Sequence, residues 1–199
     1  MVSDSITGPN PTMATVPRES SGAYSLTNER AERALLRLQD QFADAFFEVR
    51  RFRDEVTVFV PREKIVEVCA FLKSDAELNY NYLCDLTAND WIDRDPRFEV
   101  ILQLHSVGAG GHYTYLRLKV RVPEDDCVCP SVTSVWRTAN WHEREVHDLF
   151  GIRFEGHPDL RRILLPEEFN GHPLRADHEI GWEEPEFTVR KVPRKLAKS

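Results

Sequence analysis

Hydrophobic and polar residues alternate in two stretches near the middle of the chain. Apolar side chains occupy every second position in 98–104, and the same pattern recurs in 116–122 with Arg and Lys between them. Because successive side chains of a strand point to opposite faces, each stretch predicts a strand with one buried face and one face in water. The glycines within 108–111 provide a turn. The two stretches are therefore predicted to form an antiparallel hairpin.

Other segments carry apolar residues at helical spacing. Helices are predicted from about residue 29 to 48, from Pro61 through Leu72, and over 131–150. The β-branched and aromatic run 55–60 predicts a strand, and a further strand is expected near 80–86. This order predicts an α+β fold: a two-layer sandwich with a mixed or antiparallel sheet, followed by a helix and a long extended C-terminal segment.

The chain divides into four regions by composition. Residues 1–25 are rich in Ser, Thr, Pro and Gly and predict a disordered arm, while 26–150 form the α+β domain. Residues 151–187 lack a sustained period but keep apolar side chains, which predicts an extended segment that docks on a partner and becomes ordered with it. The basic tail, 188–199, is either solvated or in contact with an acidic partner.

Charge and hydropathy narrow the possible classes of function. A net charge of −7 over 199 residues argues against nucleic-acid binding, which needs a surplus of Lys and Arg. No apolar run approaches the ~18–20 residues of a membrane span, and the N-terminus lacks the pattern of a signal peptide. The four cysteines are irregularly spaced and predict free thiols in a reducing compartment. Membrane contact is therefore expected only through a partner.

Residues 141–151 contain the densest chemical motif, in which His142-Glu143 is followed by His147. Zinc hydrolases of this type place two histidines at i and i+4, about 40° apart around a helix. Here the second histidine is at i+5, about 140° away, so the two imidazoles cannot converge on one metal from an unbroken helix. A stand-alone metal-dependent hydrolase that uses His142, Glu143, His147 and His157 is kept as the alternative function.

A helical wheel of the same motif places Trp141 on the apolar half of the helix, and Glu145 falls inside that half. Because a buried carboxylate is costly unless it is paired, Glu145 is expected to meet an arginine. That arginine would come from a partner or from Arg161, Arg162 or Arg175. On the other half, Glu143–His147 and Arg144–Asp148 are expected to support the helix as i,i+4 pairs.

Two related pieces, 156–161 and 171–175, each begin with Gly-His-Pro and end in arginine. Pro and Gly restrict the local backbone, so His157 and His172 are held in set directions. Hydrogen bonding to backbone is the preferred interpretation of these histidines over a metal site. Since 127–129 holds a lone pair of cysteines and no glycine-rich nucleotide loop is present, no cofactor is expected in this chain.

The segment from Pro130 to Asp177 resembles the signature of the 30-kDa subunit of proton-pumping NADH:quinone oxidoreductase (complex I), which is also called its C subunit. The residues that carry the resemblance are Glu143-Arg-Glu145, Asp148-Leu-Phe150, His157, Arg161, Ile163-Leu164, Leu165-Pro166, Gly171-His-Pro-Leu-Arg175 and Asp177. The family usually continues with Lys-Asp-Tyr after the last arginine, where this chain has Ala176-Asp177-His178.

The resemblance implies a non-catalytic peripheral-arm subunit that docks on the D (49-kDa) subunit near the quinone module. FMN and iron–sulfur clusters are then expected in partner subunits, and the protein is expected on the cytoplasmic side of a bacterial plasma membrane. The sequence does not identify the electron donor or the quinone. The residues expected to serve structure or docking are Glu143, Arg144, Glu145, Asp148, His157, Arg161, Arg162, His172 and Arg175.

Overall fold

The structure, a computed structural model, describes residues 25–179 except 44, 46, 54 and 109–112. The predicted arm before Ser25, the basic tail and the last part of the predicted docking segment, 180–187, lie outside the described residues.

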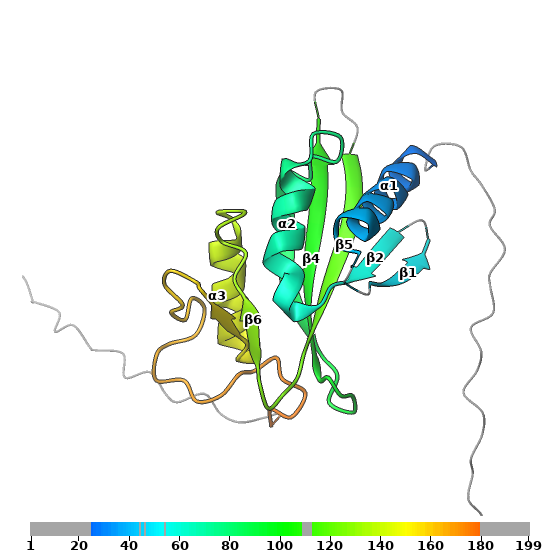
Figure 1. Ribbon diagram of the computed structural model, residues 1–199. Helices are drawn as coiled ribbons and strands as arrows, with labels where there is room; N and C mark the ends of the chain where they lie inside the picture. Colours follow the sequence, from blue (N-terminus) through cyan, green and yellow to red (C-terminus); the bar gives the residue numbers. More distant parts are fainter. Residues whose placement is uncertain (1–24, 44, 46, 54, 109–112, 180–199) are drawn as a thin grey trace, which may run out of the picture.

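A five-stranded mixed sheet forms the centre of the molecule, with strand order β1-β2-β5-β4-β3 (Figure 1). β2 and β5 are parallel, and the other neighbouring strands are antiparallel. Two further short strands, β6 and β7, pair in parallel as a second sheet. The bounds are β1 Glu48–Phe52, β2 Glu55–Phe59, β3 Tyr82–Asp90, β4 Phe98–Val107, β5 Tyr113–Val122, β6 Val128–Pro130 and β7 Arg153–Glu155.

The predicted antiparallel hairpin is confirmed as β4 and β5, and its register explains the alternating sequence. Leu102 lies opposite Leu118, and both side chains are almost fully buried. The opposite face is less exposed to solvent than predicted: Glu99 is buried and accepts a hydrogen bond from Lys119 at 2.8 Å. The basic groups of Lys119 and Arg121 also lie over the ring of Phe59, 5.8 and 4.3 Å from its centre.

Three helices contribute to one hydrophobic core on the apolar face of the sheet (Figure 1). They are α1 Ser25–Gln41, α2 Ile65–Ser74, which follows a 3-10 turn, and α3 Ala139–Phe150. Leu38 of α1, Leu72 of α2 and Val146 of α3 all belong to this core and are buried. The α+β prediction with a mixed sheet is therefore confirmed.

The first predicted helix is too long at its C-terminal end. α1 ends at Gln41, and the chain returns as the edge strand β1, which the sequence did not predict. Phe42 and Phe47 pack edge to face with ring centroids 6.4 Å apart, so they close a turn between the two elements. Spacing alone could not separate this turn from a continued helix, because β1 owes its conformation to pairing with β2.

The predicted helix over 131–150 is likewise shorter, since α3 begins only at Ala139. Residues 128–130 form β6, and turns fill most of the gap before α3. The backbone N–H of Val132 is a hydrogen-bond donor to a side chain of α3. These residues therefore line the helix and do not extend it.

The C-terminal segment packs on its own domain over residues 151–179. It opens with β7, and Ile152, Phe154 and Phe169 are buried. The chain's own domain therefore covers these three side chains, and they do not contribute to the predicted docking on a partner. Leu164 and Leu174 remain 61% and 52% exposed.

Candidate functional site

Residues 141–150 of the motif described above lie on α3, and two carboxylates of this helix are buried. Glu143 and Asp148 both have 0% exposure. Ala139, Glu143, Val146 and Phe150 recur every three or four residues, which is the spacing of one face of a helix. Because buried carboxylates need hydrogen-bond donors, the partners of these two acids determine what must pack around α3.

Glu143 is held by neutral donors. Its Oε2 accepts a hydrogen bond from Ser131 Oγ at 2.6 Å, and its Oε1 accepts one from the Val132 N–H at 2.8 Å. Burial raises the pKa of Glu143 to about 7, and the bonds from Ser131 and Val132 offset only part of that effect. The protonated form of Glu143 therefore persists to a higher pH than that of an exposed glutamate.

Asp148 differs from Glu143 because its carboxylate accepts hydrogen bonds from several N–H groups, including one on a charged arginine. Its Oδ2 accepts backbone hydrogen bonds from Ile163, Leu164 and Leu165 at 2.8–3.0 Å. Its Oδ1 accepts one from Arg162 at 2.8 Å. Burial acts to raise the pKa of Asp148, but the three backbone bonds and Arg162 together outweigh it and lower the pKa. Asp148 therefore stays ionised and fastens residues 162–165 to α3.

The prediction that Glu145 is buried and paired with Arg161, Arg162 or Arg175 is wrong, whereas pairing with an arginine of a partner stays a prediction. Glu145 is exposed, and it makes no ion pair with any residue that the structure describes. Trp141, which the wheel placed on the buried half, is 61% exposed. The wheel ranked positions by hydrophobicity, whereas the folded helix buries the acids for which donors from 131–132 and 162–165 are available.

The expected i,i+4 pairs on α3 are replaced by longer-range contacts. Arg144 donates to the carbonyls of Arg161 and Arg162 at 2.9 and 3.0 Å, and its guanidinium lies 5.4 Å from the centre of the Trp141 ring. Asp148 forms its ion pair with Arg162 and not with Arg144. Arg144 therefore fixes the backbone of the C-terminal segment beside α3.

The histidines of the hydrolase alternative are not brought together on one metal position. Among the residues described between 25 and 179, no group of three or more His, Cys, Asp or Glu side chains is arranged to hold a metal ion. Each histidine contacts a different part of the domain: His142 the carboxylate of Asp85 at 3.6 Å, His147 the carbonyl of Ile152 at 3.1 Å, and His157 the carbonyl of Asn140 at 3.2 Å. The hydrolase alternative has no support in this arrangement.

The second Gly-His-Pro piece caps the C-terminus of α3. His172 Nδ1 lies 2.9 Å from the carbonyl of Asp148, and the Leu174 N–H donates to the carbonyl of Leu149 at 3.1 Å. These bonds satisfy carbonyls that have no partner within the helix. Gly151, with φ +78, allows the close approach, since a Cβ there would lie 2.6 Å from the His172 ring. The piece therefore positions 171–175 against the helix end.

Arg97 is a site residue that the sequence patterns did not identify. It is buried and bonds to Asp90 at 2.7 Å, to Glu124 at 2.6 Å and to Asp177 at 2.9 Å. It thereby joins the end of β3 and the chain after β5 to the C-terminal segment. Arg97 precedes β4 in a loop with no periodicity, so its role depends on carboxylates that are distant in sequence.

The predicted arginines take different positions. Arg161 lies at the surface, where it pairs with Asp159 at 2.7 Å. Arg175 supports the network of Arg97 by donating to Glu124 at 3.0 Å. Neither arginine contacts α3 through Glu145.

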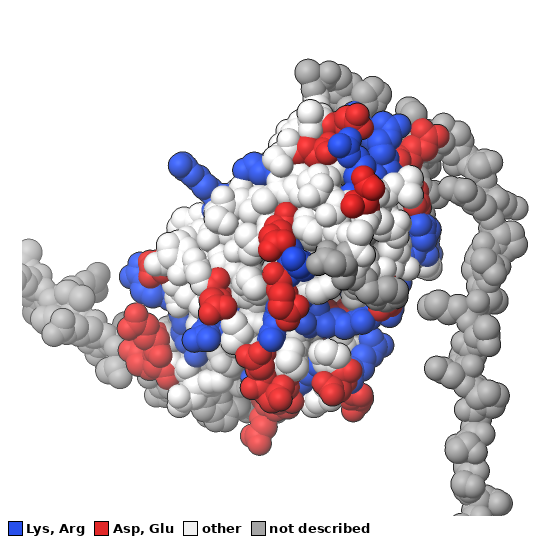
Figure 2. Space-filling view, viewed as in Figure 1, with Lys and Arg blue, Asp and Glu red and all other residues white. Residues whose placement is uncertain are grey.

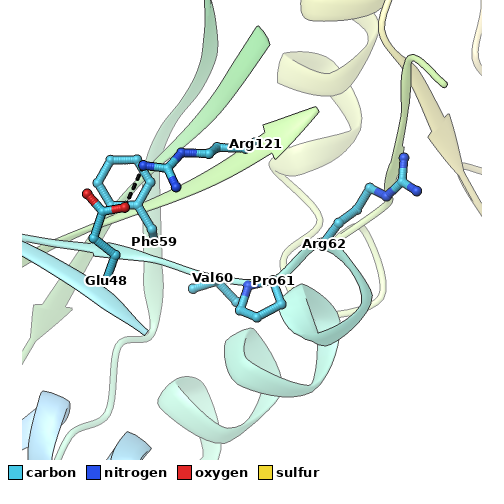
Figure 3. Close-up of a pocket in the computed structure, with 6 residues that line it drawn as sticks. All are labelled: Glu48, Phe59, Val60, Pro61, Arg62 and Arg121. Carbon is cyan, nitrogen blue, oxygen red and sulfur yellow. Dashed lines mark hydrogen bonds and ion pairs between the residues drawn. The ribbon is translucent and has the colours of Figure 1, made fainter. Parts of the chain in front are cut away.

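A small pocket of about 200 Å³ lies away from α3, lined by Glu48, Phe59, Val60, Pro61, Arg62 and Arg121 (Figure 3). Arg121 bonds to Glu48 at 2.6 Å, and Arg62 bonds to Asp126 at 2.7 Å. Both arginines are thus already paired with carboxylates, and none of the predicted site residues lines the pocket.

The surface charge is mixed. On the face shown in Figure 2, acidic and basic side chains are interspersed in small clusters. In the part of the chain that the structure describes, no helix combines the length and apolar character needed to cross a membrane.

Comparisons with known proteins agree with the fold. The sequence profile of the family described as the respiratory-chain NADH dehydrogenase 30 Kd subunit matches residues 58–184. The C subunit of NADH-quinone oxidoreductase from Geobacter sulfurreducens is 48% identical over 149 residues, which cover 74% of this chain and 89% of that protein. The namesake from a Roseiflexus species is 46% identical over 157 residues, covering 79% of this chain and 88% of that protein.

Two solved structures share the architecture. The trypsin-resistant fragment of Nqo5 is 36% identical with a TM-score of 0.56, covering 66% of this chain and 99% of the fragment. A chain of a membrane-bound sulfane sulfur reductase, an archaeal respiratory membrane complex, is 29% identical with a TM-score of 0.61, covering 75% of this chain and 85% of that chain. The fold is thus of the class found in respiratory complexes. This chain belongs to the family of the respiratory-chain NADH dehydrogenase 30 Kd subunit.

Replacing Asp148 with Asn tests whether its charge fastens 162–165 to α3. The substitution leaves Arg162 without its counter-charge and weakens the three backbone bonds, so the free energy of unfolding should fall by about 3 kcal/mol in urea titrations. Asp159→Asn makes the same change in a fully exposed ion pair, where solvent screens the charges, and should leave the free energy of unfolding unchanged within error. Equal effects of the two variants would show that Asp148 is not a structural anchor.

Replacing Glu143 with Gln tests its raised pKa. Because that pKa is higher in the folded protein, this group stabilises most below pH 4.5, and its contribution is lost as the pH rises to about 7. The Glu143→Gln variant should therefore gain about 3 kcal/mol relative to the original protein between pH 4.5 and 7.5. Urea unfolding across this range measures the difference. The exposed Glu145→Gln control should show no such trend, and a pH profile of Glu143→Gln parallel to that of the original protein would contradict the assignment.

Proposed function

We propose that this chain is a non-catalytic peripheral-arm subunit of a proton-translocating NADH:quinone oxidoreductase and that it docks on the D (49-kDa) subunit near the quinone module. Family membership supports the complex. The observation that carries the docking proposal is the exposure of three large apolar side chains on α3 and the segment after it: Trp141, Leu164 and Leu174. Exposed large apolar groups on a rigid support are typical of protein interfaces.

These three residues and Arg144 define the docking surface of this proposal. Arg144 stacks near Trp141 and holds the carbonyls just before Leu164, so both apolar groups are fixed relative to α3. Leu174 is fixed through its backbone bond to Leu149. Trp and Arg are the residue types that most often dominate binding energy, and preorganised side chains lose little entropy on binding.

The other expected docking residues have supporting or peripheral roles in this proposal. Arg161 and Glu145 are exposed and lie at the rim, where charges mainly influence association rate and orientation. The remaining residues act from within the domain by holding the surface in shape: Glu143, Asp148, His157, Arg162, His172 and Arg175.

The proposal assigns redox chemistry to other subunits. FMN and iron–sulfur clusters are placed in partners, and the complex brings this chain to the cytoplasmic side of a bacterial plasma membrane. The Cys127 and Cys129 thiols have pKa values raised by burial, to about 12 for Cys129, which disfavours the thiolate that cluster ligation needs.

A spectrum of the purified full chain tests this assignment of cofactors. The expected result is protein absorbance alone, with neither flavin bands nor stoichiometric iron. Reconstitution with iron and sulfide under reducing conditions should likewise leave no cluster after desalting. Stoichiometric flavin or iron in the chain alone would contradict the proposal.

Removing the exposed apolar groups tests the docking surface. The double variant Trp141→Ser and Leu164→Ser should bind the D-type subunit at least about tenfold more weakly, since central apolar anchors each contribute upwards of about 1–2 kcal/mol. Titration calorimetry or co-purification measures the effect. The matched control carries Leu36→Ser on α1 and Phe52→Ser on β1, which are 65% and 71% exposed away from α3.

The control should bind like the original chain, and both variants should keep its melting temperature because all four side chains are exposed. If the control lowers affinity and the α3 variant does not, docking occurs through the α1–β1 side of the domain, and the proposed surface is wrong.

A further inference from the structure

Two imidazoles lie together where the C-terminal segment meets the end of α3. The ring centres of His147 and His172 are 6.5 Å apart. His147 Nδ1 is 3.1 Å from the carbonyl of Ile152, and His172 Nδ1 is 2.9 Å from the carbonyl of Asp148. A carbonyl can only accept, so both rings carry their proton on Nδ1 and are neutral when Nε2 is unprotonated.

Among the residues that the structure describes, the charged side chains of Arg162 and Asp148 act on His147. Arg162 and Asp148 face the rings and bond to each other at 2.8 Å, so the carboxylate is already neutralised by the guanidinium. The carbonyl end of α3 favours one positive charge. Protonation of His147 would nevertheless place a second cation beside Arg162, and His147 is half-buried, where a charge is poorly solvated.

The same residues hold the turn that displays Leu174. His172 attaches to the end of α3, and Arg162 Nη2 donates to the carbonyl of Gly171 at 3.3 Å. The Leu174 N–H completes the attachment through the carbonyl of Leu149. Repulsion between protonated His147 and Arg162 therefore acts directly on the turn 171–175.

We propose that His147 and His172 form an acid-sensitive latch, which keeps the turn 171–175 on the end of α3 while His147 is neutral and releases it when His147 is protonated. The latch concerns this chain alone, and it regulates docking only if the docking surface proposed above is correct. It predicts that acid removes Leu174 from the surface before the domain unfolds.

The sign of the effect follows from the environment of His147. Burial lowers its pKa from 6.5, and His172 and Arg162 lower it further, although the bond to Ile152 opposes the shift. The folded state therefore favours neutral His147, and its contribution to stability is lost as the pH falls below 6.5. Asp148 remains ionised in this range because its own pKa is lowered, and Glu143 acts in the opposite direction.

Hydrogen exchange of the full chain at pH 7.5 and 5.5, corrected for the intrinsic rates, tests the latch. Peptides that cover 171–175 should be clearly less protected at pH 5.5 than at pH 7.5, because the folded state disfavours protonated His147. Peptides from β4 and β5 should keep theirs. His147→Asn and His172→Asn retain a neutral donor near the Nδ1 position, and each should reduce the loss.

His105→Asn is the matched control, because His105 is also a half-buried histidine but packs on Tyr115 in the sheet. This variant should respond to pH like the original chain. Unchanged protection of 171–175 in the original chain at pH 5.5 would overturn the latch, as would an undiminished loss in both Asn variants.

Two further measurements keep these outcomes distinct. Should an Asn variant fail to fold, proton NMR titration of the original chain decides the matter, since the ring signals of His147 must titrate below pH 6.5 together with the amide of Leu174. Separate titration of the two would overturn the latch. Binding of the D-type subunit at pH 7.5 tests the proposed function alone, because the latch is closed there.

Discussion

The bond between the Asp148 carboxylate and the backbone of residues 163–165 is the constraint on which the C-terminal half of the molecule depends. A side chain with no exposure must satisfy its negative charge internally, and three consecutive N–H groups with Arg162 do so. These donors exist only if the chain returns to α3 after β7 and forms a tight turn. One buried charge thereby specifies the path of a segment that has almost no regular secondary structure.

Glu143 and Asp148 show how neighbouring acids on one helix acquire different protonation states. Both are fully buried, yet the pKa of Glu143 rises to about 7 and that of Asp148 falls. The difference lies in the donors: a hydroxyl and one N–H for Glu143, against three N–H groups and a guanidinium for Asp148. Glu143 therefore joins α3 to residues 131–132 through a carboxyl group that can gain or lose its proton near neutral pH, whereas Asp148 acts as a fixed anion.

The sequence patterns predicted those helices and strands whose conformation is indicated by residues close together along the chain. The β4–β5 hairpin follows from alternation of period two, and α2 follows from helical spacing after Pro61. β1 was not predicted because its conformation depends on pairing with β2, and the role of Arg97 was not predicted because its carboxylates come from three separate segments. Predictions failed where a long-range partner decides the outcome. The same limit applies to the motif on α3, where hydrophobicity placed Glu145 inside and Trp141 against the core, but the positions of the donors reversed both assignments.

The charged side chains of the motif on α3 and after it are engaged in contacts within the chain, so a partner must recognise other groups. Several of the residues expected to dock were found in internal contacts, including Asp148, Arg162 and His172. A partner that bound them would have to break existing hydrogen bonds, at a cost it could not easily recover. Binding energy must then come from side chains that the motif positions but does not use. Leu164 is the clearest case: its N–H bonds to Asp148 while its side chain is 61% exposed. An apolar group on a backbone fixed in this way is preorganised, so docking need not include the ordering of residues 162–165.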